Sequence, residues 1–221
     1  RMVYTYDGIF GTPVGVACTY VFMFVLFGQV FNAAGGGNFF FRLAASIAGR
    51  MRGGPAKICV IASALYGCLK AGDVLVSAVG APYDTMLGAI GVVDKGHGSL
   101  KDYGVEYRQV ELLDNKPDLT GMAKAVADPK VKAVLIQRSK GYSTRASLSV
   151  DEIGEMCTVI KKANPNAAII VDNCYGEFVE EKEPTHVGAD LVVGSLIKNP
   201  GGGLAPIGGY ICGTKECVER C

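Results

Sequence analysis

The sequence predicts an α/β domain in which helices cover both faces of a mostly parallel β-sheet. From residue 61 onward, short apolar runs alternate with helical patterns, which is typical of strand–helix–strand units. Most of the apolar runs are continuous, as is usual for strands that are buried on both faces. Glycine, proline, aspartate and asparagine stand at the joins between them. The chain of 221 residues is long enough for one large domain or about one and a half.

The first half of this domain predicts two helices and two strands. In chain order, a helix, a strand, a helix and a strand are expected at residues 61–69, 74–79, 83–90 and 105–112. Gly72 and Asp73 stop the first helix, and Pro82 precedes the second. The last of the four elements alternates apolar and polar residues, which indicates a strand with one polar face.

The second half predicts two further helices and four strands. In chain order, these elements are expected at residues 118–127, 131–136, 149–162, 167–171, 190–193 and 207–212. Ser149 and Glu152 form a capping box that opens the second of these helices, and Asn164-Pro165 end it. The last strand follows a glycine-rich loop, so we expect it to run opposite to its neighbours.

Composition and charge narrow the classes of function. The formal net charge of +1 argues against a dedicated nucleic-acid binder. The eight cysteines include no C-x-x-C pair, and only two histidines are present, which argues against a zinc site. Several cysteines lie within apolar segments, so we expect reduced thiols in a cytoplasmic protein.

Residues 1–60 differ in composition from the rest of the chain. Residues 8–41 carry no charge, and the stretch from Val14 to Phe31 is almost continuously apolar. An apolar run of about 20 residues can span a bilayer. Three interpretations stay open: a membrane anchor, a buried phenylalanine-rich core segment, and a stretch foreign to the domain that a frameshifted or chimeric gene would add. The predicted domain therefore covers residues 61–221.

Two polar side chains follow two of the predicted strands. Asp172 ends one apolar run, and Lys198 lies in a glycine-rich stretch shortly after another. The carboxyl ends of parallel strands share one edge of a sheet, where ligands bind. A pyridoxal phosphate (PLP) enzyme needs this pair, because its lysine amine forms a Schiff base with the cofactor aldehyde while a carboxylate keeps the pyridine nitrogen protonated. Taken singly, a surface lysine and a structural ion pair or helix cap remain alternatives; together the two residues predict a PLP site.

Three further residues follow strand ends and suit such a site. The Ser195 hydroxyl would bind the cofactor phosphate, the Tyr83 ring would stack on the cofactor ring, and Arg138 would hold a carboxylate or a phenolic oxygen. Their structural alternatives are a turn serine, a packing tyrosine and a solvated basic loop. Four acidic residues beside Lys182 are interpreted as a solvated face: Glu177, Glu180, Glu181 and Glu183.

Long motifs around these residues resemble a known family. The stretches VDNCYGEF at 171–178 and GADLVVGSLIKNPGGG at 188–203 look like the methionine gamma-lyase family that includes the aluminium resistance proteins. They are similar, more distantly, to cystathionine beta- and gamma-lyases. PYDT at 82–85 and QRSKGY at 137–142 fit the same pattern. The resemblance runs from about residue 61 to residue 221.

The resemblance implies a fold-type I PLP enzyme that carries out elimination at a C–S bond of a sulfur amino acid. Lys198 would be the Schiff-base lysine and the proton shuttle, and Asp172 the pyridinium partner. Ser195 would be a phosphate ligand, and Tyr83 the stacking ring and a catalytic residue. The substrate would be a small amino acid. Family members build the active site across a dimer, so the resemblance also implies a homo-oligomer.

Two features depart from the family pattern. The family's Ser-Gly-Thr-His-Ala phosphate motif would fall near residues 56–60, which here read AKICV. The chain stops at Cys221, whereas family members continue into a C-terminal domain that supplies an arginine for the substrate carboxylate. The resemblance therefore implies an incomplete large domain.

Two other functions stay open. Motifs around the lysine discriminate poorly between PLP reactions, so transamination on the same fold is an alternative. The other is a non-catalytic or membrane-anchored protein in which the glycine-rich turn is a phosphate-binding or purely structural loop. The Walker A pattern is absent, which argues against a nucleoside triphosphatase.

Overall fold

The computed structural model describes Leu26 and residues 56–93, 98–202, 204–205 and 208–221, with the backbone alone at 56–60. The chain divides into two units, Arg1–Arg52 and Gly53–Cys221. Apart from Leu26, every described residue belongs to the second unit. Apart from Leu26, the apolar stretch from Val14 to Phe31 lies outside the described part, so its three interpretations stay predictions.

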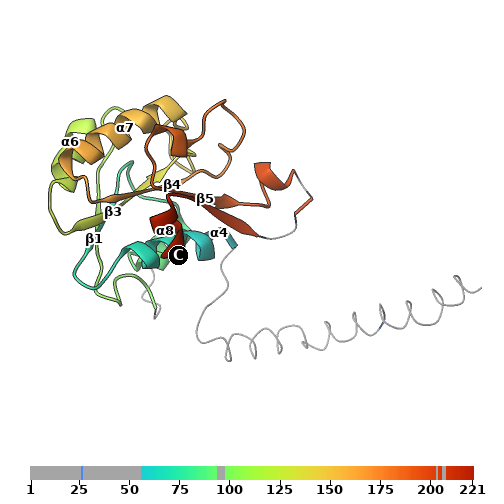
Figure 1. Ribbon diagram of the computed structural model, residues 1–221, viewed down its shortest axis with the longest axis horizontal. Coiled ribbons are helices and arrows are strands. Elements are labelled where there is room, and N and C mark those ends of the chain that lie inside the picture. The colour runs from blue at the N-terminus through green and yellow to red at the C-terminus, as the bar shows by residue number, and fades with distance from the viewer. Residues whose placement is uncertain (1–25, 27–55, 94–97, 203, 206–207) are drawn as a thin grey trace, which may run out of the picture. The chain divides into compact units, whose positions relative to one another are not determined.

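A six-stranded sheet organises the second unit, in the order β2-β1-β3-β4-β5-β6 (Figure 1). Its strands are β1 (Val74–Ser77), β2 (Glu106–Gln109), β3 (Val131–Gln137), β4 (Ala168–Asp172), β5 (Leu191–Ser195) and β6 (Gly209–Gly213). The first five strands pair in parallel, and β6 runs antiparallel to β5. The structure thus confirms the mostly parallel sheet and the reversed last strand.

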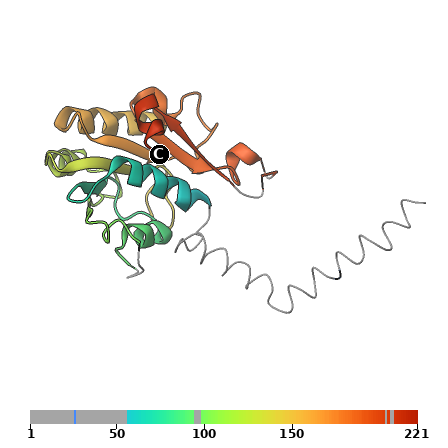
Figure 2. The ribbon, with the colours of Figure 1, turned by 60° about the horizontal axis from the view of Figure 1, so that its bottom comes forward.

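Helices cover both faces of this sheet, as Figures 1 and 2 show. On one face lie α6 (Leu119–Val126) and α7 (Val150–Ala163), which share a hydrophobic cluster with the sheet. The other face packs against α4 (Ala56–Cys68), α5 (Asp84–Ile90) and α8 (Lys215–Glu219). The predicted α/β architecture with helices on both faces is confirmed.

Alternate residues of each central strand supply the two clusters. In β1, Val74 and Val76 pack towards α6 and α7, whereas Leu75 packs with the α4 side. In β4, Ile169 and Ile170 divide in the same way. Side chains alternate between the faces of a strand, so a strand that is apolar throughout must be covered on both sides. This is the physical reason why continuous apolar runs predicted this fold.

The helix signals also act as expected. Ser149 and Glu152 form both hydrogen bonds of the capping box at the start of α7. Asp118 caps α6 by accepting a hydrogen bond from the amide of Gly121 (2.9 Å). Helix α4 begins at Ala56, five residues before the expected start of the first helix. The sequence patterns did not predict the short helices η2 (Pro184–Val187), η3 (Asn199–Gly201) and α8. Within the described residues, no helix is long and apolar enough to cross a membrane.

Candidate functional site

The carboxyl ends of β3, β4 and β5 carry three of the predicted site residues. Asp172 is the last residue of β4, and Ser195 is the last residue of β5. These strands are parallel neighbours, with Asp172 opposite Val193. Arg138 directly follows β3, and its amide donates to the Asp172 carbonyl (3.0 Å). The sheet therefore brings these residues to one edge, as the sequence predicts.

Asp172 and Ser195 are almost completely buried at this edge. Each is only 1% exposed. One carboxylate oxygen of Asp172 accepts a hydrogen bond from the amide of Cys174 (3.2 Å). The Ser195 hydroxyl donates to the carbonyl of Gly208 (3.5 Å), in the chain that leads into β6. A carboxylate this deeply buried favours a cationic partner, because an uncompensated charge is costly away from water.

Tyr83 lies close enough to Asp172 for the two side chains to interact electrostatically. It is the residue that precedes α5, and its amide donates to Oε1 of Gln137 (3.1 Å) at the end of β3. Burial raises the pKa of the Tyr83 phenol, and the charge of Asp172 raises it further. The phenol therefore stays neutral at physiological pH and presents an aromatic ring close to the buried carboxylate.

Lys198 begins the turn that follows β5. Its carbonyl accepts hydrogen bonds from the amides of Gly201 and Gly202 (3.2 Å each), which closes η3. Its Nζ lies 3.7 Å from the centre of the Tyr175 ring. Gly202 has φ of 53°, and a Cβ placed there would meet nothing within 4 Å. The turn thus borders open space at Gly202, and the Lys198 amine lies over the ring of Tyr175.

Arg138, predicted as a ligand for the cofactor, bonds to groups of the protein itself. Its side chain is 3% exposed and points into the protein. It donates hydrogen bonds to the Leu148 carbonyl, the Asn173 side chain, the Gly176 carbonyl and the Glu180 carboxylate. The carboxylate that Arg138 holds is therefore one of the protein's own. These hydrogen bonds join the segment after β4 to the end of β3 and support a structural role, while the contact of Arg138 with a cofactor stays a prediction.

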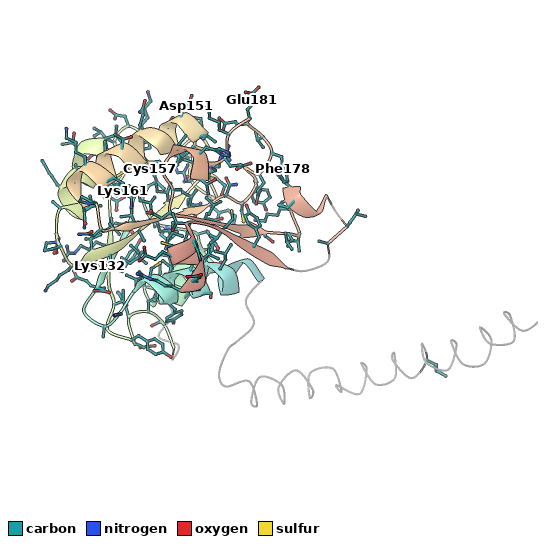
Figure 3. The ribbon with its side chains drawn as sticks, viewed as in Figure 1. Lys132, Asp151, Cys157, Lys161, Phe178 and Glu181 are labelled. Atoms are coloured by element: carbon teal, nitrogen blue, oxygen red, sulfur yellow. The ribbon has the colours of Figure 1, made fainter. Side chains whose placement is uncertain are left out.

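The interpretation of the four glutamates as a solvated face is wrong for Glu177, and Glu183 is only half-exposed. Glu177 is 4% exposed, Glu180 pairs with Arg138, and Glu183 accepts from the side chain of Asn173 (2.8 Å). Glu180 and Glu181 are exposed, as the interpretation expects, and Figure 3 shows Glu181 at the outer edge of its loop. Composition could not distinguish them, since a carboxylate turns inward only where folding brings it a donor.

Glu177 and its partner Tyr210 were not among the predicted site residues. The Tyr210 hydroxyl on β6 donates to Oε1 of Glu177 (3.0 Å) and accepts from the side chain of Asn173 (3.4 Å). Burial raises the pKa of Glu177, although the Tyr210 hydrogen bond opposes this, and nearby Asp172 raises it further. No sequence pattern separates Glu177 from the other glutamates, because its apolar neighbours Phe178-Val179 also adjoin Glu180 and are exposed.

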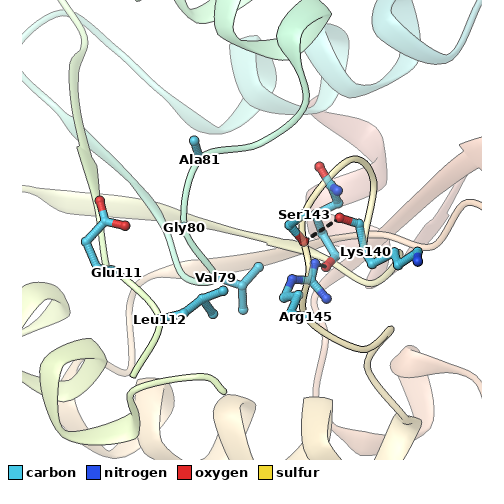
Figure 4. Close-up of a pocket in the computed structure, with 9 residues that line it drawn as sticks. Val79, Gly80, Ala81, Glu111, Leu112, Lys140, Ser143 and Arg145 are labelled. Atoms are coloured by element: carbon cyan, nitrogen blue, oxygen red, sulfur yellow. Dashed lines mark hydrogen bonds between the residues drawn. The ribbon is translucent and has the colours of Figure 1, made fainter. Parts of the chain in front are cut away.

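A separate cavity of about 280 Å³ opens near the ends of β1 and β3 (Figure 4). Its lining includes Gly80, Glu111, Lys140 and Arg145. The Arg145 guanidinium is occupied by main-chain carbonyls, among them that of Gln137 (2.6 Å). None of the five predicted site residues lines it, so the strand-end cluster and not this cavity is the candidate active site.

Comparison with known proteins assigns the family. A family model described as methionine gamma-lyase matches residues 55–221. The chain belongs to the methionine gamma-lyase family. A second model, described as the DctM component of a tripartite ATP-independent periplasmic transporter, matches residues 3–79. That match spans less than half of the chain and overlaps the first at residues 55–79.

Two curated relatives of the chain are both described as uncharacterized proteins. The chain is 52% identical over 163 residues to the uncharacterized protein YnbB of Bacillus subtilis, covering 73% of this chain and 38% of that protein. It is 46% identical over 140 residues to an uncharacterized 33.9 kDa protein of Lactobacillus delbrueckii, covering 63% and 46%. The chain thus spans less than half the length of these relatives.

Several solved structures are similar to this chain in both fold and sequence. A protein of Clostridium acetobutylicum, described as a candidate cystathionine beta-lyase involved in aluminum resistance, is 49% identical with a TM-score of 0.72, covering 74% of this chain and 40% of its own. A carbon-sulfur lyase involved in aluminum resistance from Clostridium novyi is 43% identical with a TM-score of 0.70, covering 74% and 39%. A PLP-dependent aminotransferase of Streptococcus suis, 20% identical with a TM-score of 0.56 over 75% and 42%, shares the fold alone. The sheet is that of fold-type I PLP-dependent enzymes.

Proposed function

We propose that this chain provides the PLP-binding part of an enzyme that breaks a C–S bond of a sulfur amino acid. The observation that carries the proposal is the juxtaposition of strand ends: buried Asp172 ends β4, and Lys198 follows β5, its neighbour in the sheet. Family membership and the names of the solved relatives support the reaction class. The activity, the substrate and any assembly of identical chains belong to the proposal, because the chain covers about 40% of those solved chains.

The residues present fit the chemistry of PLP. Lys198 offers an amine in a turn that borders open space, and Asp172 offers a carboxylate with 1% exposure. Tyr83 adds an aromatic ring beside that carboxylate. Ser195 adds a hydroxyl at the end of the neighbouring strand. An amine, a carboxylate, a ring and a hydroxyl are the groups that a cofactor with an aldehyde, a pyridine nitrogen, a flat ring and a phosphate requires.

Each residue then has a distinct task. PLP supplies an electron sink that eases bond breaking next to the substrate's amino-bearing carbon. Lys198 Nζ would attach the cofactor and would carry protons to and from the substrate carbon. Asp172 would keep the pyridine nitrogen protonated, and its burial would limit the access of water there. The Tyr83 ring would pack against the cofactor ring, and Ser195 would hold the phosphate.

Addition of PLP to the 221-residue chain tests the cofactor part of the proposal. We expect a visible absorbance band, and borohydride reduction followed by peptide mass mapping should place the cofactor on Lys198. Lys198→Ala should lose both signals. Lys182→Ala is the matched control, because Lys182 is an exposed lysine in the segment between β4 and β5. A folded wild-type chain that takes up no PLP would contradict the proposal.

The reaction class needs a separate measurement on the full-length protein. Elimination from a sulfur amino acid releases an α-keto acid together with ammonia and a thiol. Transamination instead passes the amino group to an acceptor keto acid without releasing ammonia. Formation of keto acid and ammonia in equal amounts would support the lyase, whereas keto acid formed only when an acceptor is present would establish the transaminase.

A further inference from the structure

The turn after β4 contacts two consecutive residues of the lysine segment. In this turn, residues 173–178, the Tyr175 ring lies 3.7 Å from Lys198 Nζ. The carbonyl of Glu177 accepts a hydrogen bond from Nδ2 of Asn199, the next residue along the chain (3.0 Å). The same turn therefore contacts both the Lys198 amine and the residue that follows Lys198 in the chain.

The backbone of this turn is strained. Tyr175 has φ of 70° and Phe178 has φ of 62°, both in the left-handed region that side chains with a Cβ rarely adopt. Such conformations persist where the surrounding structure holds them, and they gather at functional sites. The two strained residues flank Gly176 and Glu177, and contacts of this central pair hold the turn together with Glu183, which accepts from the Phe178 amide (2.8 Å).

Glu177 is held through its side chain. Its Oε1 accepts from the Tyr210 hydroxyl (3.0 Å), which reaches it from β6 across β5. The pair meets at Gly194, where an added Cβ would lie 2.5 Å from both Glu177 Oε1 and a ring carbon of Tyr210. Only glycine at this position of β5 leaves room for the contact. The contact between Glu177 and Tyr210 therefore lies directly against Gly194 of β5.

Burial of the Glu177 carboxyl group is energetically unfavourable, which indicates that this residue does more than fill space. Glu177 is 4% exposed, and its second oxygen, Oε2, has no hydrogen-bond partner among the described residues. Burial of a carboxyl group with an unsatisfied oxygen disfavours folding, whereas an apolar side chain of similar size would pack without that penalty. Gly176 adds a second anchor, since its carbonyl accepts from Arg138 (2.8 Å).

We propose that Glu177 and Tyr210 are positioning residues that hold the turn at 173–178 against Lys198 and Asn199. The inference rests on the proposed function, because it assigns these residues to the placement of the cofactor-binding lysine. Their action is indirect: the side-chain pair fixes the turn, and the turn presents a ring to the amine and a carbonyl to Asn199. Glu183 also bonds this turn, because its carboxylate accepts from the Asn173 side chain and from the Phe178 amide (2.8 Å each), whereas Glu181 is exposed.

Hydrogen exchange in the 221-residue chain without PLP tests the holding action directly. Tyr210→Phe and Glu177→Ala should speed exchange of the amides at 196–202 by about fivefold, the equivalent of one net hydrogen bond. Exchange within α7 should stay unchanged. Glu177→Gln keeps an acceptor for Tyr210 and should restore slow exchange. Glu181→Gln is the control and should match the wild type. Unchanged exchange at 196–202 in both Tyr210→Phe and Glu177→Ala would overturn the proposal.

The rate of PLP capture at Lys198 gives a second readout, measured by borohydride trapping. We expect Tyr210→Phe and Glu177→Ala to slow capture by about fivefold, with Glu177→Gln and Glu181→Gln close to the wild type. If no variant captures PLP, including the wild type, the proposed function fails while the exchange result still decides the positioning role. Should Glu177→Ala not fold, Tyr210→Phe decides alone, because it removes only the hydroxyl.

Discussion

Nη1 of Arg138 lies 2.7 Å from Oδ1 of Asn173 and joins the end of β3 to the residue after β4. Asn173 in turn donates to Glu183 (2.8 Å) and to the Tyr210 hydroxyl (3.4 Å). Asp172 stands directly before Asn173, so the bonds that fix Asn173 also fix the carboxylate proposed to meet the cofactor. The hydrogen bonds among the buried polar residues around Arg138 therefore help to position Asp172 in the candidate active site.

Replacement of Arg138 should destabilise the chain strongly. Arg138→Met leaves the buried side chain of Asn173 and the Gly176 carbonyl without their donor, and we expect a loss of about 3 kcal/mol in the free energy of unfolding. Arg108→Met is the matched control, because Arg108 pairs with Glu106 and Asp128 at the surface and should cost less than about 1 kcal/mol. Urea unfolding measures both; equal losses would contradict the structural role of Arg138.

Glu177 should make stability depend on pH in a defined direction. Burial raises its pKa in the folded chain, so the folded state binds the proton more tightly than the unfolded state does. The stability that Glu177 contributes through this proton is fully present below the ordinary glutamate pKa. It is lost as the pH rises through the raised pKa of Glu177 in the folded chain. Glu177→Gln cannot lose a proton. The difference in urea midpoint, variant minus wild type, should therefore increase from about pH 4 to pH 7; a difference that stays constant would refute this.

Two glycine substitutions should have opposite effects on stability. Gly194→Ala places a Cβ 2.5 Å from Glu177 Oε1, so it should cost about 1–3 kcal/mol through forced displacement. Gly88 lies within α5, and a Cβ there would meet nothing within 4 Å. Gly88→Ala should therefore stabilise the chain by about 0.5–1 kcal/mol, because alanine favours a helix over glycine. Thermal unfolding of the two variants compares them, and stabilisation by Gly194→Ala would disprove the tight contact.

We also propose that the PLP-binding domain does not need residues 1–52. These residues form a unit of their own, and the lyase family match begins at residue 55. A chain that starts at Gly53 should have the same free energy of unfolding as the 221-residue chain to within about 0.5 kcal/mol, the usual range for changes remote from a core. Urea unfolding measures both chains. The shorter chain should also capture PLP at Lys198. Loss of cooperative unfolding would show that the apolar segment belongs to the core.

The sequence alone was enough for the architecture and for part of the site. Continuous apolar runs require cover on both faces, so β1, β3, β4 and β5 were predictable together with their parallel pairing. Asp172 and Ser195 were predictable as strand-end residues for the same reason, since the carboxyl ends of parallel strands share one edge. Capping residues such as Ser149 act on amides only three residues away, which makes them visible in a linear pattern.

Only the tertiary structure decided which polar side chains turn inward. Arg138 meets Asn173 over a separation of 35 residues, and Tyr210 meets Glu177 over 33. No local pattern encodes such partners, because Arg138 meets Asn173 only after β3 has paired with β4, and Tyr210 meets Glu177 only after β4, β5 and β6 have paired. The free energy of a charged side chain depends on those partners and on the water that they displace. The sequence therefore determined where the lysine and the carboxylate of the candidate site lie, and the packing of the sheet decided what holds them there.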